Sequence, residues 1–95
     1  MKVIIAAAGT AGHINPGLAI ANKIKQEEKN SNIIFIGTDR GLENDLVPRA
    51  GYELKTIDAY GLNKEISIEN FKKIIKTVKG YYEAKKIIRE FNPDI

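Results

Sequence analysis

Residues 6–24 (AAAGTAGHINPGLAIANKI) bring glycines and the single histidine of the chain together, between an apolar run and an amphipathic pattern. Gly9, Gly12 and Gly17 permit tight turns and close approach of a ligand to the backbone. A helix that begins directly after such a loop offers unpaired N–H groups and a positive dipole end, which together favour a phosphate or diphosphate. This segment is therefore a candidate anion-binding loop, although a plain strand-to-helix turn explains the same spacing equally well.

Two common nucleotide-binding motifs do not match this loop. The dinucleotide motif G-x-G-x-x-G fails because an alanine stands two residues after Gly9. The P-loop motif G-x-x-x-x-G-K-[ST] has its gap at Gly12 and Gly17, but Leu18 follows where the motif requires lysine. Any bound phosphate would thus be held in another way.

His13 lies within this loop and has two interpretations. The simpler one is a histidine that bonds the backbone near the start of a helix. The other is a general base, because an imidazole with an intrinsic pKa of about 6.5 can take a proton near neutral pH. A metal site is not expected, because the chain has one histidine and no cysteine.

Strand-like and helix-like patterns alternate along the chain, which predicts an α/β fold with a mostly parallel, Rossmann-like sheet. Ligands of such sheets bind at the carboxyl ends of the strands, and the glycine loop follows the first strand. Strands are expected at residues 2–7, 32–37 and 52–57, a loop at 59–65, and the start of a fourth strand at Asp94-Ile95.

Three helices are expected between these strands. Asn15 as N-cap and Pro16 as first helical residue predict the start of the first helix, with Leu18, Ile20, Ala21 and Ile24 on its apolar side. A short second helix is interrupted by Pro48 and ended by Gly51. The third runs from about residue 66 to 91, with Gly80 as a weak point and Asn92-Pro93 as its stop. Its apolar positions are Phe71, Ile74, Ile75, Val78, Tyr82 and Ile88.

Positive charge is concentrated in this last helix. Residues 71–90 hold seven basic and two acidic groups, a net charge of +5 within a chain whose total is +3. A solvated lysine face beside an apolar side that packs on the sheet explains the pattern, and so does contact with an anionic lipid surface. Nucleic acid is not expected as a partner, because the chain contains no recognised nucleic-acid-binding motif. The absence of cysteine fits a reducing cytosol.

The segment GTAGHINPGLAIA resembles the first glycine loop of the MurG family, which usually reads GGTGGHxxPGLAxA. The later segments IGTDRGLENDLVPRAGYE, IDAYGLNKE and FNPDI are similar to family segments in the same order. The resemblance thus runs along the whole chain. It departs from the family pattern at Ala8 and Ala11, where glycine is usual.

The resemblance implies the first part of the N-terminal, acceptor-binding domain of a GT-B glycosyltransferase. Residues 1–95 would contain the glycine loop (8–13) and the basic amphipathic helix (about 66–91), while the second glycine loop and the C-terminal donor domain are absent. The full enzyme would serve peptidoglycan synthesis. It would transfer N-acetylglucosamine from UDP-GlcNAc, a substrate, to the muramoyl 4-hydroxyl of undecaprenyl-linked lipid I, with inversion, and would give lipid II. No cofactor is implied, and the 95 residues alone are expected to be inactive.

The resemblance also implies roles for particular residues. His13 is the candidate base or orienting residue, and the substrate-binding residues would be Gly9, Thr10, Ala11 and Gly12. The family docks peripherally on the cytoplasmic face of the cell membrane, which implies membrane contact by Phe71, Lys72, Ile75, Lys76 and Lys79. The alternative is a non-catalytic module: a phosphate- or nucleotide-binding half-domain, or a membrane-associated subunit of a split glycosyltransferase.

Overall fold

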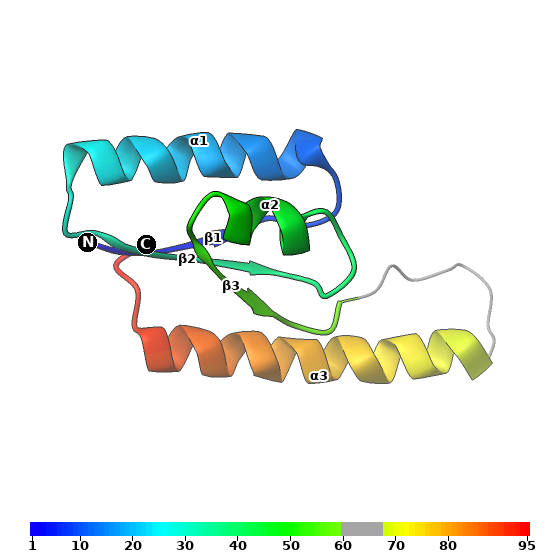
Figure 1. The fold of residues 1–95 in the computed structure, drawn as a ribbon. Helices are drawn as coiled ribbons and strands as arrows, with labels where there is room; N and C mark the ends of the chain where they lie inside the picture. The colour runs from blue at the N-terminus through cyan, green and yellow to red at the C-terminus, as the bar shows by residue number, and fades with distance from the viewer. Residues whose placement is uncertain (60–67) are drawn as a thin grey trace.

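The computed structural model describes residues 1–59 and 68–95, and the side chains of its last helix from residue 71 onward. The predicted loop at 59–65 therefore lies almost wholly outside the described residues, as does the predicted helix start at 66. The elements follow the expected order (Figure 1): β1 (Lys2–Ala6), α1 (Ala11–Glu27), β2 (Asn32–Gly37), α2 (Glu43–Arg49), β3 (Glu53–Thr56) and α3 (Ile68–Phe91).

The three strands form one parallel sheet in the order β1-β2-β3. In its register, Ile34 at the centre of β2 lies opposite Ile4 of β1 and Glu53 of β3. The apolar run that forms β2 is buried from Ile33 to Gly37, as expected for a strand covered on both faces. The predicted parallel α/β sheet is therefore confirmed.

The helices lie on both faces of this sheet. Figure 1 shows α1 and α2 over one face and α3 along the other. The core on the first face joins Phe35 of β2 to Ile14 and Ala21 of α1 and Val47 of α2. Ile34 and Ile36 alternate with Phe35 along the strand, so their buried side chains point to the face that α3 covers.

The structure corrects the predicted start of α1. The helix begins at Ala11 rather than Pro16, and Thr10 is its N-cap residue in an extended conformation. The carbonyl oxygen of Thr10 accepts hydrogen bonds from the N–H groups of His13 and Ile14. Asn15-Pro16 was a misleading cap signal: Pro16 lies inside α1, where its missing N–H removes the hydrogen bond to the Gly12 carbonyl without ending the helix. The second half of the glycine loop is thus the first turn of a helix.

Packing along α1 also differs in detail from the sequence pattern. Ile20 is 57% exposed, whereas Ala21 is fully buried and Leu18 and Ile24 pack against the core. Gly17 faces the sheet, where an added Cβ would lie 3.3 Å from side-chain carbons of Ile5 and Phe35. The last glycine of the loop motif therefore serves close helix–sheet packing rather than ligand binding.

The chain ends beside β1. The N–H of Asp94 donates to the carbonyl of Lys2 at 2.7 Å, and the N–H of Ile4 donates to the carbonyl of Ile95 at 2.9 Å. Asp94 and Ile95 are not assigned to a strand, but their hydrogen bonds lie along the free edge of β1, where the expected fourth strand would start. A strand on this edge would reverse the strand order at β1, and the crevice outside the carboxyl ends at such a reversal is where open α/β sheets bind ligands. The glycine loop leaves β1 at this point.

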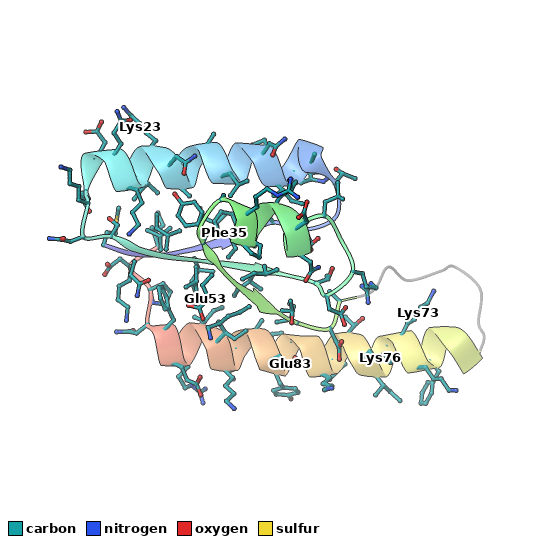
Figure 2. All side chains as sticks on the ribbon, in the orientation of Figure 1. Lys23, Phe35, Glu53, Lys73, Lys76 and Glu83 are labelled. Atoms are coloured by element: carbon teal, nitrogen blue, oxygen red, sulfur yellow. The ribbon has the colours of Figure 1, made fainter. Side chains whose placement is uncertain are left out.

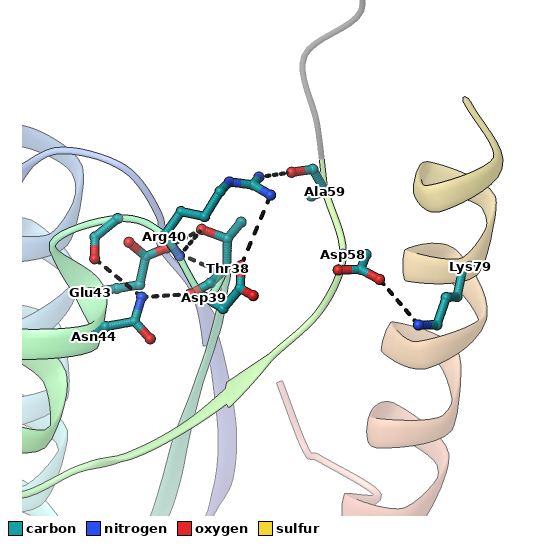
Figure 3. Close-up of polar contacts among 9 residues, drawn as sticks. Thr38, Asp39, Arg40, Glu43, Asn44, Asp58, Ala59 and Lys79 are labelled. Carbon is teal, nitrogen blue, oxygen red and sulfur yellow. Dashed lines mark hydrogen bonds and ion pairs between the residues drawn. The ribbon is translucent and has the colours of Figure 1, made fainter. Parts of the chain in front are cut away.

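Gly80 allows α3 to approach the loop after β3. Gly80 is buried, and a Cβ added to it would overlap the backbone carbonyl of Asp58. The neighbouring Lys79 Nζ lies 3.3 Å from the carboxylate of Asp58 (Figure 3). The predicted weak point of the helix is therefore a close-packing position. The predicted stop is confirmed, because Asn92 adopts a positive φ of 52° directly after α3.

Candidate functional site

The glycine loop leaves the carboxyl end of β1 with one residue in a left-handed conformation. Gly9 has a φ of +95°, which side-chain-bearing residues rarely adopt. Ala8 and Ala11, which stand where the resembled family has glycine, are not among the residues with positive φ, so alanine is unstrained at both. Because Ala11 is the first residue of α1, the N–H groups of Ala11 and Gly12 have no intrahelical partner. These two amides are therefore donors that a ligand could use.

His13 and Thr10 stand together on the first turn of α1. The Thr10 hydroxyl oxygen and the Nδ1 atom of His13 are hydrogen-bonded at 3.3 Å, on the exposed side of the turn. When Nδ1 carries the proton, it donates to the hydroxyl, and the Nε2 lone pair is left able to accept a proton. The pair can therefore present a neutral base at the edge of the sheet.

Glu43 is the residue that sequence reasoning missed. It is fully buried at the start of α2, although charged side chains are seldom buried without partners. One carboxylate oxygen accepts from the N–H of Gly9 at 3.2 Å, and the other from the N–H and the hydroxyl of Thr38, at 2.9 and 3.1 Å. Figure 3 shows its contact with Thr38. Glu43 therefore joins the glycine loop to the segment that follows β2.

The hydrogen bonds also set the ionisation of Glu43. Burial alone would raise its pKa, but bonds from the Thr38 N–H, its own backbone, the Gly9 N–H and the Thr38 hydroxyl outweigh burial, so the pKa is lowered. The carboxylate is thus charged at neutral pH. An acidic residue in the first turn of a helix is common, so no local pattern separates Glu43 from ordinary helix-end charges.

Gly9 is held at both of its backbone groups. Its N–H donates to Glu43, and its carbonyl accepts from the N–H of Leu42 at 3.0 Å. The loop is therefore fastened to the start of α2 through Gly9, and not through the amides of Ala11 and Gly12.

The segment after β2 is itself ordered by side chains (Figure 3). The Asn44 side-chain amide donates to the carbonyls of Thr38 and Gly41, at 2.9 and 3.2 Å. The guanidinium of Arg40 donates to the carbonyl of Ala59 beyond β3. A cavity of about 270 Å³ opens at the same edge of the sheet, lined by residues that follow or end the three strands: Ala6, Ala7, Ala8, Ile36, Gly37, Thr38, Ile57 and Ala59. Its lining is mostly apolar, so it suits an uncharged part of a ligand.

The apolar side of α3 points away from the sheet. Gly80, Glu83, Ala84 and Ile87 are buried or half-buried, and they mark the sheet-facing side at helical spacing. The predicted apolar stripe lies on the other side and is exposed: Phe71 at 63%, Ile74 at 46%, Ile75 at 55%, Val78 at 51%, Tyr82 at 63% and Ile88 at 48%. The interpretation in which this stripe packs on the sheet is therefore wrong. The helix covers the sheet instead with small residues and with the aliphatic parts of longer side chains. Lys72, Lys76 and Lys79 lie exposed along one flank of the stripe.

In the described part of the chain, no three His, Cys, Asp or Glu side chains gather where they could hold a metal ion. Within the same residues, no helix combines the length and apolarity needed to cross a membrane.

Comparisons with known proteins agree on one family. The glycosyltransferase family 28 N-terminal domain matches residues 3–95. This chain is similar to two bacterial enzymes, from Thermoanaerobacter sp. (strain X514) and Clostridioides difficile (strain 630). Both are named UDP-N-acetylglucosamine--N-acetylmuramyl-(pentapeptide) pyrophosphoryl-undecaprenol N-acetylglucosamine transferase. They are 50% and 44% identical over all 95 residues, which span 26% and 23% of their lengths.

A solved structure of Acinetobacter baumannii MurG shares the fold. It superposes with a TM-score of 0.76 at 24% identity, over 98% of this chain and 26% of that one. The glycine loop, the parallel sheet and the match over residues 3–95 lead to the same conclusion: this chain belongs to the glycosyltransferase family 28 N-terminal domain.

Proposed function

We propose that this chain is the acceptor-side part of an enzyme of peptidoglycan synthesis that transfers N-acetylglucosamine from UDP-GlcNAc to lipid I. The observation that carries the proposal is the glycine loop at the carboxyl edge of the sheet, with two unpaired amides and His13 on one helical turn. Relatives with that transferase name match every residue of the chain. Because the chain spans about a quarter of their length, the donor site would lie in the remainder.

The chemistry divides between the loop and the histidine. The amides of Ala11 and Gly12, with the Thr10 hydroxyl, face the sugar or diphosphate, and Gly9 shapes the turn. His13 Nε2 accepts the proton of the muramoyl 4-hydroxyl as its oxygen attacks the sugar carbon. The bond from that carbon to the phosphate oxygen breaks, UDP leaves with the electron pair, and the configuration inverts. No cofactor enters this step.

The outward face of α3, made of the exposed apolar stripe and the lysines on its flank, supports peripheral binding to the cytoplasmic face of the membrane. Phe71 and Ile75 would enter the interface, and Lys72, Lys76 and Lys79 would attract anionic headgroups. An exposed apolar stripe with lysines on its flank fits that role, since large exposed apolar patches mark interaction surfaces.

A chimera tests the proposed transfer. Residues 1–95 replace the matching segment of the Thermoanaerobacter sp. (strain X514) relative, to which they are 50% identical. We expect the chimera to convert radiolabelled UDP-GlcNAc and lipid I into lipid II, and the isolated 95 residues to be inactive. The control is the unaltered relative.

A folded chimera without transfer would contradict the proposal. If, in that case, the isolated 95 residues still bound inorganic diphosphate, the alternative of a non-catalytic phosphate-binding module would be favoured. Transfer by the isolated chain would show that the missing part is not needed, and would also contradict the assignment of the donor site to that part.

A further inference from the structure

We infer that Glu43 is a positioning residue for the glycine loop: its buried carboxylate fixes Gly9 and so holds the Ala11 and Gly12 amides and the His13 ring at the edge of the sheet. The kinetic part of this inference rests on the proposed function. The structural part does not.

The carboxylate links the loop directly to the sheet. One oxygen accepts from the Gly9 N–H at 3.2 Å, and the second oxygen is tied to Thr38 by two hydrogen bonds. Thr38 directly follows β2, so the carboxylate is anchored to the sheet rather than to a free loop. Glu43 therefore fixes the position of Gly9 relative to the end of β2.

The space around the carboxylate is closed by glycines. A Cβ added to Gly41 would overlap Glu43 Oε1 and come within 2.8 Å of the Gly9 nitrogen. A Cβ added to Gly37 would lie 2.8 Å from both Cγ and Oε2 of Glu43. The carboxylate therefore fits closely between two glycines, and a larger side chain at either position would displace it.

The hydrogen-bond donors around this position require a carboxylate. The groups of Gly9 and Thr38 that point at it are donors, and an ionised carboxylate only accepts. A glutamine of the same shape would turn its NH₂ group toward one of these donors. Such a mismatch leaves a buried donor unpaired and weakens the hold on the loop.

The first experiment compares Glu43→Gln with Asp45→Asn in the chimera of residues 1–95 with the Thermoanaerobacter relative. Asp45 is a matched control, because it lies in the same helix, is exposed and pairs with Arg49 on the surface. We expect Glu43→Gln to lower kcat about ten- to a hundred-fold, since misplacement of reacting groups by about 1 Å has effects of that size. The kcat of Asp45→Asn should stay within two-fold of the parent kcat. Equal kcat in the two variants, both folded, would overturn the inference.

The second experiment needs no activity. In ¹⁵N-labelled 95-residue chain, Glu43→Gln should shift the Gly9 amide resonance upfield and speed its hydrogen exchange at least ten-fold. The Ile34 amide in β2 should exchange within two-fold of the parent rate. An unchanged Gly9 amide would overturn the inference, whatever the kinetics show. An inactive parent chimera would instead count against the proposed function alone.

Gly41→Ala reaches the same contact from the other side. Its methyl group would press on both the carboxylate and the Gly9 nitrogen while leaving Glu43 ionisable, and it should reproduce both the loss of kcat and the change at the Gly9 amide. If neither Glu43→Gln nor Gly41→Ala folds, the carboxylate holds the whole domain rather than the loop, and the inference is wrong.

Discussion

The Thr10 hydroxyl and the His13 Nδ1 atom lie 3.3 Å apart across the first turn of α1, and this contact occupies one of the two ring nitrogens of His13. A base acting through Nε2 needs Nδ1 to be protonated, and the Nδ1–H can then donate a hydrogen bond to the Thr10 hydroxyl oxygen. Thr10, the N-cap residue of α1, therefore favours the tautomer in which Nδ1 of His13 is protonated.

Replacing His13 by alanine in the chimera should lower kcat by ~10²–10⁴, the usual contribution of a positioned general base. The fold should be unaffected, because the ring is exposed. Steady-state kinetics with lipid I measure the effect. Retention of more than a third of the parent turnover would end the base hypothesis.

Thr10→Val should lower kcat by about five-fold, since a hydrogen bond contributes on the order of 1 kcal/mol net. Thr10→Ser keeps the hydroxyl and should recover most of the lost turnover. A valine variant with the parent pH–rate profile and kcat would show that the contact does not orient His13.

Gly80→Ala should destabilise the chain although alanine favours helix formation. Its Cβ would overlap the Asp58 carbonyl, so α3 would have to move away from the sheet. Overpacking of this kind costs about 1–3 kcal/mol, which exceeds the gain of ~1 kcal/mol in helix propensity. Urea denaturation measures the difference, with the exposed Thr77→Ala as control. A Gly80→Ala chain as stable as the control would contradict the close contact.

Glu43 should make stability depend on pH in acid. Its pKa is lowered in the folded chain, so its stabilisation is complete above the unfolded value of about 4.3 and is lost as pH falls through the lower folded value. The parent should therefore be more stable than Glu43→Gln at pH 7, and this gap should narrow below about pH 4. Urea midpoints at pH 7, 4 and 3 test this. A gap that stays constant would show that the charge of Glu43 does not stabilise the fold.

The outward face of α3 predicts binding to vesicles that contain anionic lipid. Lys72→Glu with Lys76→Glu should weaken binding at least about ten-fold, since each surface cation contributes up to ~1 kcal/mol. Lys79 is left unchanged because it pairs with Asp58.

The matched control is Lys23→Glu with Lys29→Glu, which makes the same change in net charge. Lys23 is on α1, on the opposite side of the molecule from α3 (Figure 2). Phe71→Ser should weaken binding even at high salt, because its contribution is apolar. Equal loss in the two lysine pairs would indicate a general charge effect and no specific membrane face.

Much of the fold could be predicted from local patterns. The apolar run at 32–37 forms β2 with the predicted bounds, and Gly51 and Asn92 end their helices as expected. Such features depend on neighbouring residues, since strand burial and helix ends are set within a few positions of the chain. The start of α1 was missed because Asn15-Pro16 imitates a cap, while the extended Thr10 supplies the real one.

Local sequence patterns were enough to predict the alternation of strands and helices, and with it the place of Gly9 to His13 at the carboxyl edge of a parallel sheet. The contact of Glu43 with Gly9 and the outward orientation of the apolar side of α3 became visible only in the folded chain. Glu43 and Gly9 are 34 residues apart, and they meet because β1 and β2 align in register and carry their following loops to one edge. A local pattern records which residues can be buried, but the alignment of distant strands decides which of them meet.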